Sequence, residues 1–334
     1  MKIAVVILNW NGQKLLEQFL PSIIDFSKEA TIYVADNAST DASVAYVTTN
    51  FPNITILQNA QNFGFAKGYN VALRNVNADV FALVNSDIEV TKNWLQPIIA
   101  TFIKEPLTAI IQPKILDYKN KGCYEYAGAA GGFIDKYGYP FCRGRIFETL
   151  EKDTQQYDDV SEIFWASGAC FFIRQPVFSD LNGFDEDFFA HQEEIDLCWR
   201  AFNNNYVAKY NSKSVVYHVG GATLEKSNPQ KTYLNFRNSL LMLAKNLPKN
   251  KFVSIILIRM LLDGIAGFQF LWKGKFSHFS AILKAHFSFY FMIRSTLNKR
   301  NGIQKQNYFY TKSIVYQYFI KKGTIFEKRF NNSL

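Results

Sequence analysis

The sequence predicts an α/β fold in which a mostly parallel sheet carries helices on both faces. Short apolar runs alternate with segments of helical periodicity along residues 1–115, the pattern of successive β–α units. Polar clusters follow these apolar runs or begin the helices after them, as expected near the carboxyl ends of parallel strands. With 334 residues, 48% of them hydrophobic, the chain can bury a sizeable core in one large domain or two.

The individual strands and helices follow from the spacing of apolar residues. Apolar, often β-branched runs bounded by turn residues predict strands at Ile3–Leu8, Thr31–Ala35, Ile54–Leu57 and Val80–Val84. Helical periodicity predicts helices at Gln13–Phe26, after Asp41, from Asn62 to about Asn75, and at Thr91–Phe102. Because a helix connects each pair of successive strands, the strands are expected to run parallel.

The remainder of the chain is less regular and then becomes helical. Residues 112–157 are rich in glycine and tyrosine and are predicted to form hairpins and loops over a crevice. Later strands are expected at Phe164–Ile173, Val207–Tyr210 and Ser214–Tyr217, with a helix at Gln192–Asn203. Beyond Thr223 helices are expected at Tyr233–Asn246, Phe252–Trp272 and Ala281–Ile293. We therefore predict an α/β domain at residues 1–225 and a helical region at residues 226–334.

The formal net charge of +9 is distributed unevenly along the chain. Residues 226–334 hold 14 Lys and 5 Arg against 2 acidic residues, a net charge of +17, whereas residues 1–225 carry −8. Such a basic, aromatic-rich region predicts binding to nucleic acid or to an anionic membrane surface. Nucleic acid is disfavoured, because the cations alternate with Phe, Ile and Leu at helical spacing and no recognition motif is present.

The segment Phe252–Trp272 is apolar and long enough to cross a bilayer. It carries Arg259 and Asp263 four residues apart, where they can pair on one face, and charges near the centre of a span are costly. An amphipathic helix lying on a membrane surface is therefore favoured over a spanning helix. A helical subdomain packed against the α/β domain stays open as the alternative.

Cysteine usage and the first residues indicate the compartment. The four cysteines form no CxxC pair, which fits ordinary buried thiols in a reducing environment. Ile3–Leu8 is too short for the apolar core of a signal peptide and runs into a polar turn. We expect a cytoplasmic protein, peripheral on the inner face of the cell membrane.

Asp87 is the first candidate site residue, because it directly follows the strand at Val80–Val84 and the turn pair Asn85-Ser86. A lone carboxylate at the carboxyl end of a strand is a suitable donor to a hard divalent cation that bridges two phosphates. The alternative is that Asp87 begins a turn or caps the helix at Thr91–Phe102.

Three further polar clusters are expected at the same edge, namely residues 9–12, 36–41 and 62–70. Asp36 could accept from a base N–H or a ribose hydroxyl. Gly64 and Gly68 allow close approach of backbone to a ligand, the helix N-terminus favours negative charge, and Lys67 adds a cation. The alternative for each glycine is a simple turn. No GxGxxG follows the first strand and no Walker lysine loop is present, so dinucleotide redox chemistry and P-loop phosphoryl transfer lose support.

An acidic cluster begins the helix at Gln192–Asn203. Glu193 and Glu194 lie in its first turn among aromatic residues, and both desolvation and a neighbouring like charge can raise a carboxyl pKa. A raised pKa suits a general base for a sugar hydroxyl. The alternative is an acidic helix start that complements the macrodipole. His218 follows a predicted strand, where it is either structural or a metal ligand.

These motifs together resemble a family 2 glycosyltransferase of the GT-A fold, and within it the bacterial rhamnosyltransferase-like branch. The matching pieces, in the order of the family, are VVILNWNG, VADNASTDAS, NFGFAKGYN, LVNSD, SGACFFIRQPVF, LNGFDEDFFAHQEEIDLCWR and YHVGG. The resemblance covers about residues 3–222. It implies a Rossmann-like mixed sheet flanked by helices, with a C-terminal helical, basic, amphipathic region outside it.

The resemblance also implies an activity. Such enzymes transfer a sugar from a nucleotide diphosphate to a hydroxyl with inversion, using Mg²⁺ or Mn²⁺. The acceptor would be a saccharide or lipid-linked sugar in cell-surface polysaccharide synthesis, with rhamnose as one donor sugar. The alternative is a non-catalytic sugar-nucleotide-binding protein of the same fold.

Site residues can be carried over from the resemblance. Asp87 and His218 would bind the metal, and Glu194, with Glu193 beside it, would be the base. Asn85 stands where the family has the first acid of its DxD motif, which leaves one fewer anionic ligand. The nucleotide-binding residues would be Asn9, Asn11, Asp36, Asn62, Gly64, Lys67 and Asn85.

Overall fold

The computed structural model describes residues 1–220 and 228–326. The strands of the main sheet are β1 (Ile3–Asn9), β2 (Ala30–Asp36), β3 (Thr55–Gln58), β4 (Val80–Asn85), β5 (Ile88–Val90), β6 (Thr108–Asp117), β11 (Val160–Ile163), β12 (Cys170–Arg174) and β13 (Val207–His218). A smaller sheet contains β7 (Gly132–Ile134), β8 (Pro140–Cys142), β9 (Arg145–Ile146) and β10 (Thr149–Leu150).

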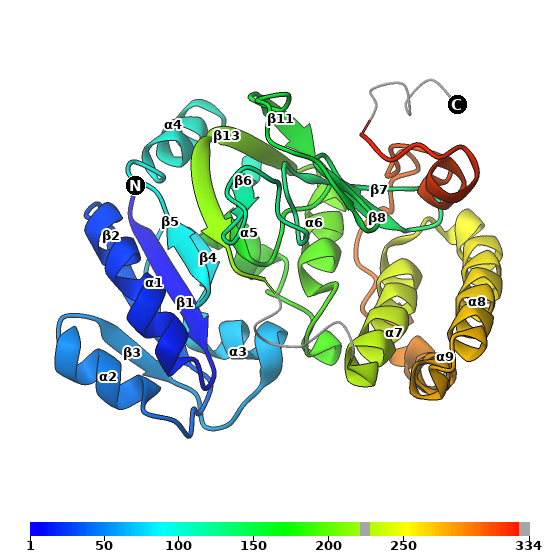
Figure 1. Ribbon diagram of the computed structural model, residues 1–334, viewed down its shortest axis with the longest axis horizontal. Helices are drawn as coiled ribbons and strands as arrows, with labels where there is room; N and C mark the ends of the chain where they lie inside the picture. Colours follow the sequence, from blue (N-terminus) through cyan, green and yellow to red (C-terminus); the bar gives the residue numbers. More distant parts are fainter. Residues whose placement is uncertain (221–227, 327–334) are drawn as a thin grey trace.

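Helices flank the main sheet and then continue beyond it (Figure 1). The first six are α1 (Gln13–Phe26), α2 (Ser43–Asn50), α3 (Gly64–Leu73), α4 (Gln96–Lys104), α5 (Gln175–Asp180) and α6 (Glu193–Asn203). The later ones are α7 (Pro229–Asn246), α8 (Lys249–Trp272) and α9 (Phe276–Asn298). Two short helical turns lie at Glu186–Phe188 and Tyr316–Ile320.

The main sheet is mixed, which confirms the predicted α/β class. Its order is β11-β13-β6-β12-β4-β1-β2-β3, with β5 paired to β13. The segment β4-β1-β2-β3 is parallel throughout, as the β–α alternation predicts. In contrast, β12 runs antiparallel to both β4 and β6. The carboxyl ends of β1, β2 and β4 therefore meet at one edge.

The prediction of hairpins and loops over residues 112–157 was wrong at its start, because residues 112–117 continue the buried strand β6. Polar residues at Gln112 and Lys114 and the intervening Pro113 interrupt the apolar run. Pro113 cannot donate a ladder hydrogen bond, and the register of the partner strand β13 shifts between Asn211 and Val215, opposite it. That irregularity also explains why β13 was predicted as two strands, Val207–Tyr210 and Ser214–Tyr217.

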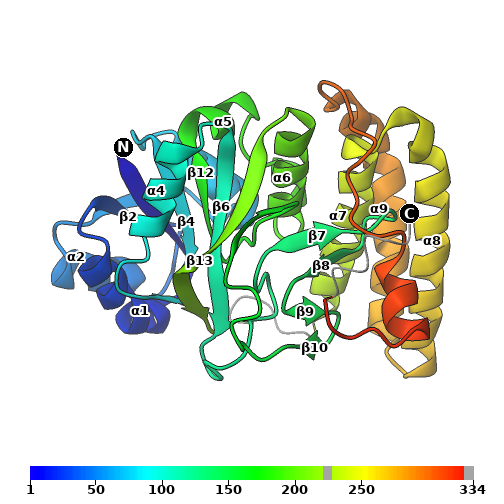
Figure 2. The same cartoon turned by 90° about the horizontal axis from the view of Figure 1, so that it is seen from above.

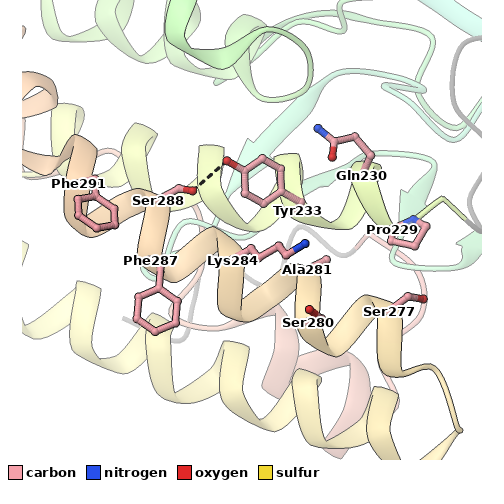
Figure 3. Close-up of a pocket in the computed structure, with 10 residues that line it drawn as sticks. All are labelled: Pro229, Gln230, Tyr233, Ser277, Ser280, Ala281, Lys284, Phe287, Ser288 and Phe291. Carbon is pink, nitrogen blue, oxygen red and sulfur yellow. Dashed lines mark hydrogen bonds between the residues drawn. The ribbon is translucent and has the colours of Figure 1, made fainter.

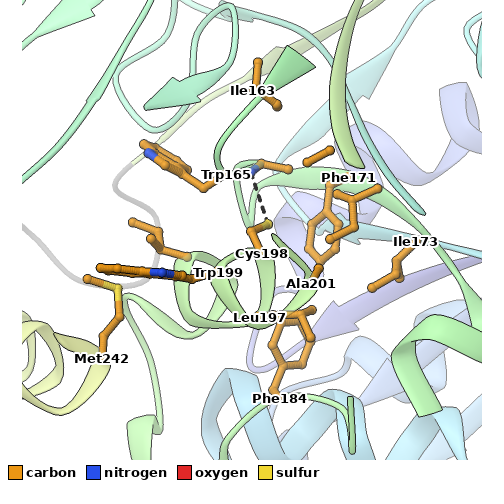
Figure 4. Packing of buried hydrophobic residues seen from close by; sticks show 14 of the residues in the cluster. Ile163, Trp165, Phe171, Ile173, Phe184, Leu197, Cys198, Trp199, Ala201 and Met242 are labelled. Carbon is orange, nitrogen blue, oxygen red and sulfur yellow. Dashed lines mark hydrogen bonds between the residues drawn. The ribbon is translucent and has the colours of Figure 1, made fainter. Parts of the chain in front are cut away.

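Alternate residues of β1 pack on opposite faces of the sheet, as strand geometry requires. Val5 and Ile7 belong to the core beneath α1 and α4, and Val6 belongs to the core shared with α3 and α6. Around α6 the second core is dense: Trp199 lies near Met242 of α7 (Figure 4). Because α7 contributes to this core, α6 is held between the sheet and the later helices.

The helices α7, α8 and α9 form a group at the end of the molecule opposite β3 (Figures 1 and 2). α9 packs against both α7 and α8. The chain then returns along the small sheet, where the Tyr310 N–H donates to the Ile134 carbonyl and the Lys136 N–H to the Thr311 carbonyl, both at 2.9 Å. The predicted domain boundary at residues 225–226, and Gly221 of the last motif, lie outside the described residues.

Candidate active site

Asn9 and Asp36 end the parallel neighbours β1 and β2 and lie side by side. Both are buried, and Asn9 Nδ2 donates to Asp36 Oδ1 at 3.0 Å. Ser39 donates to Asp36 through its N–H and hydroxyl at 2.9 and 2.6 Å, and Gln58 Nε2 donates at 2.8 Å. The carboxylate is thus held by the chain. Within the described residues, Asn9 Oδ1 is buried without a hydrogen-bond partner, so it can accept from a ligand.

Asn11 shapes the neighbouring loop. Its backbone is left-handed, with φ of 51°, and its side-chain Oδ1 accepts from the Thr40 N–H at 2.7 Å. Ser39 Oγ in turn accepts from the Asn11 N–H at 2.9 Å. The structure therefore assigns Asn11 a supporting contact between the loops after β1 and β2.

The start of α3 differs from the expectation of an open anion site. Asn62 Oδ1 accepts from the Gly64 N–H at 2.9 Å, and the Phe189 carbonyl accepts from the next two N–H groups at 2.7 and 3.3 Å. These donors are not available to a phosphate in this structure. Gly64 has φ of +75°, and a Cβ there would lie 2.6 Å from Phe189. Lys67 is half-exposed and lies 3.3 Å from Glu186 Oε2.

Asp87 is buried directly after β4, and the structure excludes it as a cap of the next helix. The strand β5 follows it at once, and α4 begins only at Gln96. Asn85, the last residue of β4, donates its N–H to the Ala169 carbonyl at 2.9 Å. Both residues thus lie at the carboxyl edge of the sheet, beside the end of β1.

His218 bridges two buried carboxylates at the end of β13. Its Nε2 lies 3.1 Å from Asp87 Oδ1 and its Nδ1 lies 3.3 Å from Glu125 Oε1. Burial opposes the charged imidazolium, but the Asp87 and Glu125 carboxylates outweigh burial and raise the pKa of His218 to about 10. Burial likewise opposes ionisation of Asp87, yet the adjacent imidazolium holds its pKa below the usual range.

Asp87 offers a carboxylate oxygen to a divalent cation, and His218 offers an imidazole nitrogen once it loses the proton that Asp87 and Glu125 stabilise, so metal binding here would release a proton. Over residues 1–220 and 228–326, no group of three His, Cys, Asp or Glu side chains is arranged to hold a metal ion. Two protein ligands leave most of the coordination to substrate phosphates and water, which is usual for Mg²⁺ at phosphate-transferring sites. Asn85 is consistent with this sparse set, because its amide brings no charge.

Glu193 and Glu194 begin α6, and each has a buried Oε2 with no hydrogen-bond partner in the described part of the chain. Burial raises the pKa of Glu194 to about 7. Burial and the adjacent Glu194 carboxyl raise the pKa of Glu193 well above its usual range. A carboxylate whose pKa lies near neutrality is suited to accept a proton from a hydroxyl.

The next acid of this cluster, Asp196, differs from the two glutamates because both of its carboxylate oxygens have partners. Its Oδ2 accepts from Arg200 Nε at 2.8 Å and lies 2.8 Å from Lys245 Nζ of α7. Its Oδ1 accepts from Asn246 Nδ2 at 2.8 Å. Asp196 therefore fixes α6 to α7 and pairs with Arg200 one turn further along α6.

The backbone before α6 is strained. Phe189, His191 and Gln192 all have φ between 61° and 73°, a region that costs energy for residues other than glycine. His191 Nε2 and Gln192 Oε1 are buried without hydrogen-bond partners among the described residues, like the two glutamates that follow. Burial and the nearby Lys231 lower the pKa of His191 to about 4, so the ring is neutral. Strain and unpartnered polar atoms concentrated in one loop indicate a ligand site.

Contacts around Gly168 connect the glutamate pair to the metal-site edge. A Cβ at Gly168 would lie 3.7 Å from Glu194 Cδ, and the next residue, Ala169, accepts the N–H of Asn85. On the other side, both Glu125 and Glu194 act electrostatically on the buried Cys142 thiol. Since Asn85 in turn pairs with β1, these contacts link the surroundings of Glu194 to the edge of the sheet that carries Asp36 and Asp87.

Residues 4–181 match the family described as Glycosyl transferase family 2. The chain belongs to this family. It is therefore a glycosyltransferase that uses a nucleotide-sugar donor, on a GT-A-type fold with added C-terminal helices.

Relatives of known name are distant from this glycosyltransferase. It is 23% identical over 237 residues to an N-acetylglucosaminyl-diphospho-decaprenol L-rhamnosyltransferase of Mycobacterium tuberculosis, covering 66% of this chain and 76% of the relative. A structure of S. aureus TarS with UDP-GlcNAc superposes with a TM-score of 0.56 at 18% identity, covering 98% of this chain and 93% of the other. A GalNAc-T7 structure with UDP, GalNAc and Mn²⁺ gives 0.59 at 15% identity. It covers 75% of this chain, which spans about half (49%) of that one.

Sequence reasoning missed several residues of the site. Glu125, which contacts His218, comes from the segment predicted as loops, and no motif marks it. Ser39 and Gln58, which hold Asp36, are ordinary polar residues at the ends of strands. Their position just beyond β2 and at the end of β3 is the one signal that could have identified them.

Proposed function

We propose that this glycosyltransferase is an inverting enzyme that moves a sugar from a nucleotide diphosphate to a hydroxyl of a saccharide or lipid-linked acceptor. Its place would be cell-surface polysaccharide synthesis. The name of the mycobacterial relative supports rhamnose as the sugar and a diphosphate-linked lipid as the acceptor. Mn²⁺ in a structural neighbour supports a divalent cation at Asp87 and His218.

One observation carries the proposal: Glu193 is buried and Glu194 partly buried, and each has a buried carboxyl oxygen with no hydrogen-bond partner among the described residues. Burial raises the pKa of both, and contacts around Gly168 link Glu194 to the sheet edge that carries Asp87. Glu194 takes the proton from the acceptor's hydroxyl group while the hydroxyl oxygen attacks the anomeric carbon of the donor sugar. The attack comes from the face opposite the diphosphate. Asn9 and Asp36 orient the nucleotide. A bound Mg²⁺ or Mn²⁺ would stabilise charge on the departing diphosphate. Holding both substrates in place supplies much of the remaining rate enhancement.

The experiment is a donor screen on the full chain with Mn²⁺ present, using dTDP-, UDP- and GDP-sugars. Thermal shift identifies the donor, and release of nucleoside diphosphate measures turnover in parallel. Binding with product supports the enzyme. Binding without any product, with or without added acceptors, contradicts the proposal and favours the non-catalytic alternative, which Asn85 in place of an acid supports.

We also propose that α8 lies on an anionic membrane surface. Six apolar residues spaced three or four apart form a stripe along it, each between 58% and 93% exposed: Val253, Leu257, Leu261, Ile265, Phe268 and Trp272. We refer to these six as the apolar face. Water-exposed apolar area of this extent normally has a partner, and the net charge of +17 over residues 226–334 favours an anionic one.

The charged residues of α8 support a helix lying on the surface. Within the described residues α8 is the one helix long and apolar enough to span a membrane. Arg259 and Asp263, however, are buried against the protein, 3.7 Å apart, and Arg259 lies 3.9 Å from the Tyr139 ring centroid. Lipid all round the helix would require separating these contacts, whereas a surface position leaves them intact.

A hollow of about 540 Å³ beside the apolar face adds to this picture. It lies between α7 and α9 and combines hydroxyls, one cation and two exposed rings: Tyr233, Ser277, Ser280, Ser288, Lys284, Phe287 and Phe291 (Figure 3). A polar, cationic hollow next to an apolar surface matches the boundary between lipid head groups and acyl chains.

Sedimentation of the full chain with phosphatidylserine–phosphatidylcholine vesicles tests the membrane proposal. Leu261→Glu with Phe268→Glu removes two exposed apolar anchors, and we expect at least about a tenfold loss of vesicle affinity. Leu107→Glu is the matched control, since Leu107 is 69% exposed and Leu261 71%. Equal binding by all three proteins, or no binding by the wild type, contradicts the proposal.

A further inference from the structure

Two arginines lie two positions apart, Arg143 in the turn between β8 and β9 and Arg145 at the start of β9. Among the described residues, only Arg143 pairs with a carboxylate. Arg143 Nη1 donates to Asp159 Oδ2 at 2.9 Å, and its Nε donates to the Ala130 carbonyl at 2.9 Å. Its guanidinium also lies over the rings of Tyr157 and Tyr210. Arg143 is therefore a structural residue that ties this turn to the main sheet.

Arg145 has no such partner. Only 9% of its surface is exposed, yet over the described residues it makes no ion pair with a carboxylate, and its Nε is buried without a hydrogen-bond partner. Its guanidinium contacts Cys142 Sγ at 3.6 Å and lies over the Tyr126 ring, 4.7 Å from the centroid. Both contacts are weak compared with a charge-assisted hydrogen bond.

A buried guanidinium without an anion is unfavourable. Arginine remains protonated at any pH that a folded protein tolerates, so it cannot escape the cost by losing its charge. Burial of an unpaired charge costs several kcal/mol, on the order of the penalty for breaking a buried ion pair. Because the fold nevertheless buries Arg145, its side chain is placed to bind an anion that comes from outside the chain.

The position of Arg145 identifies which anion. The Cys142 thiol, in direct contact with Arg145, also lies within electrostatic range of Glu125 and Glu194. Glu125 contacts His218, which contacts Asp87. Arg145 thus lies on the small sheet beside Cys142, a thiol that is within range of the acids Glu125 and Glu194 of the candidate active site.

We propose that Arg145 binds a phosphate group of a substrate. This inference rests on the proposed function. The planar guanidinium can hold two phosphate oxygens at once, which a lysine in its place cannot do. The phosphate belongs either to the donor diphosphate or to a phosphate-bearing acceptor, since both reach the candidate active site in the proposed reaction.

Titration calorimetry on the full chain tests the site with defined probes and without turnover. The probes are inorganic pyrophosphate and UDP, GDP or dTDP, each with Mn²⁺, and the proteins are the wild type, Arg145→Met and Arg145→Lys. A loss of at least tenfold in nucleoside diphosphate affinity in Arg145→Met assigns the phosphate to the donor. Unchanged nucleotide affinity, with pyrophosphate binding lost in the nucleotide-saturated enzyme, assigns it to the acceptor. Arg145→Lys should recover part of the affinity in either case.

Thermal melting separates this role from a structural one. Arg145→Met removes an unpaired buried charge, so its Tm should equal or exceed that of the wild type, whereas Arg143→Met should melt lower because it loses the Asp159 pair. Equal affinity for every probe in the wild type and Arg145→Met, or no binding of any probe by the wild type, overturns the proposal. If Glu194 were not the base, Glu194→Gln would keep the turnover of the wild type. This result would contradict the proposed function and is separate from the binding results that test Arg145.

Discussion

The region beside α6 buries polar atoms that lack hydrogen-bond partners among the described residues, whereas the outer surface of α8 exposes apolar side chains to water. Beside α6, Glu193 and Glu194 each bury a polar oxygen without a partner. On α8, Leu261 and Trp272 expose most of their apolar surface to water. Each arrangement costs free energy in the isolated chain, the first through lost hydrogen bonds and the second through hydration of apolar area. We therefore expect a polar ligand beside α6 and an apolar partner at α8.

The two regions also differ in how their charges are placed. Arg259 and Asp263 of α8 are buried against the protein and paired. Glu193 and Glu194 are instead neighbouring acids that form no ion pair with the cations of residues 1–220 and 228–326. Pairing stabilises the fold, and crowding of like charges adjusts pKa values for chemistry. The following experiments test that contrast, in order of expected effect.

The largest effect is expected from Glu194→Gln. The amide cannot accept the hydroxyl proton, so turnover should fall by about 10²–10⁴-fold while donor affinity is kept. Glu193→Gln should cost less, because Glu193 acts through its neighbour. Steady-state kinetics with the donor found in the screen measures both. Near-normal turnover in Glu194→Gln would show that another group is the base.

A large loss of stability is expected on α8 from Arg259→Met. This change removes the cation that pairs with Asp263 and that acts on buried Asp135, while Asp263 keeps its contact with His286 Nε2 at 3.3 Å. Breaking a buried pair from one side costs about 3–5 kcal/mol. Urea unfolding followed by circular dichroism measures it, with exposed Arg294→Met as the control. If Arg259→Met and Arg294→Met lowered the free energy of unfolding equally, the Arg259–Asp263 pair would contribute little to stability.

The pH dependences of activity and of stability should have opposite signs for Glu194. Because burial raises the pKa of Glu194 to about 7, the rate should rise as pH increases through 7 and then level off. Glu193 also lies within range and is expected to shift the midpoint, whereas burial raises the pKa of the nearby Cys142 and Cys198 thiols so that they stay neutral over this range. A rate that stays constant between pH 5.5 and about 8.5 would exclude a base with this pKa.

The same shift has the opposite sign for stability. The folded state binds the Glu194 proton more tightly than the unfolded state, so stability is lost as pH rises from the ordinary carboxyl pKa towards 7. Glu194→Gln abolishes that loss. We expect its Tm at pH 8 to exceed that of the wild type by on the order of a few degrees, and the two to converge near pH 4. Differential scanning calorimetry checks both points.

The smallest effect concerns the metal ligands. Asn85→Asp restores an acid at the end of β4, beside buried Asp87. An added anionic ligand should lower the Mn²⁺ concentration for half-maximal activity by roughly tenfold or less. A metal titration of the initial rate measures this, with Ser86→Asp as the neighbouring control. An unchanged titration would show that residue 85 does not face the cation.

Sequence patterns predicted the parallel half of the sheet well, because Ile3–Asn9 and Val80–Asn85 are continuous apolar strands ending in polar residues. They failed at Thr108–Asp117, where Gln112 is buried inside the strand and donates to the Gly128 carbonyl at 3.0 Å. That bond satisfies a polar group through a contact 16 residues away, which local spacing cannot reveal. Glu125 escaped for the same reason: its partner His218 is distant in the chain.

The return of residues 308–314 along β7 has a consequence for synthesis of the enzyme. Asp135 accepts the N–H of Ile314 at 3.0 Å, and Tyr308 donates its hydroxyl to the Lys136 carbonyl at 2.6 Å. The small sheet that carries Arg145 thus acquires these contacts only after some 170 further residues have left the ribosome. A nascent chain that already displays the complete parallel sheet would still lack these contacts to its small sheet.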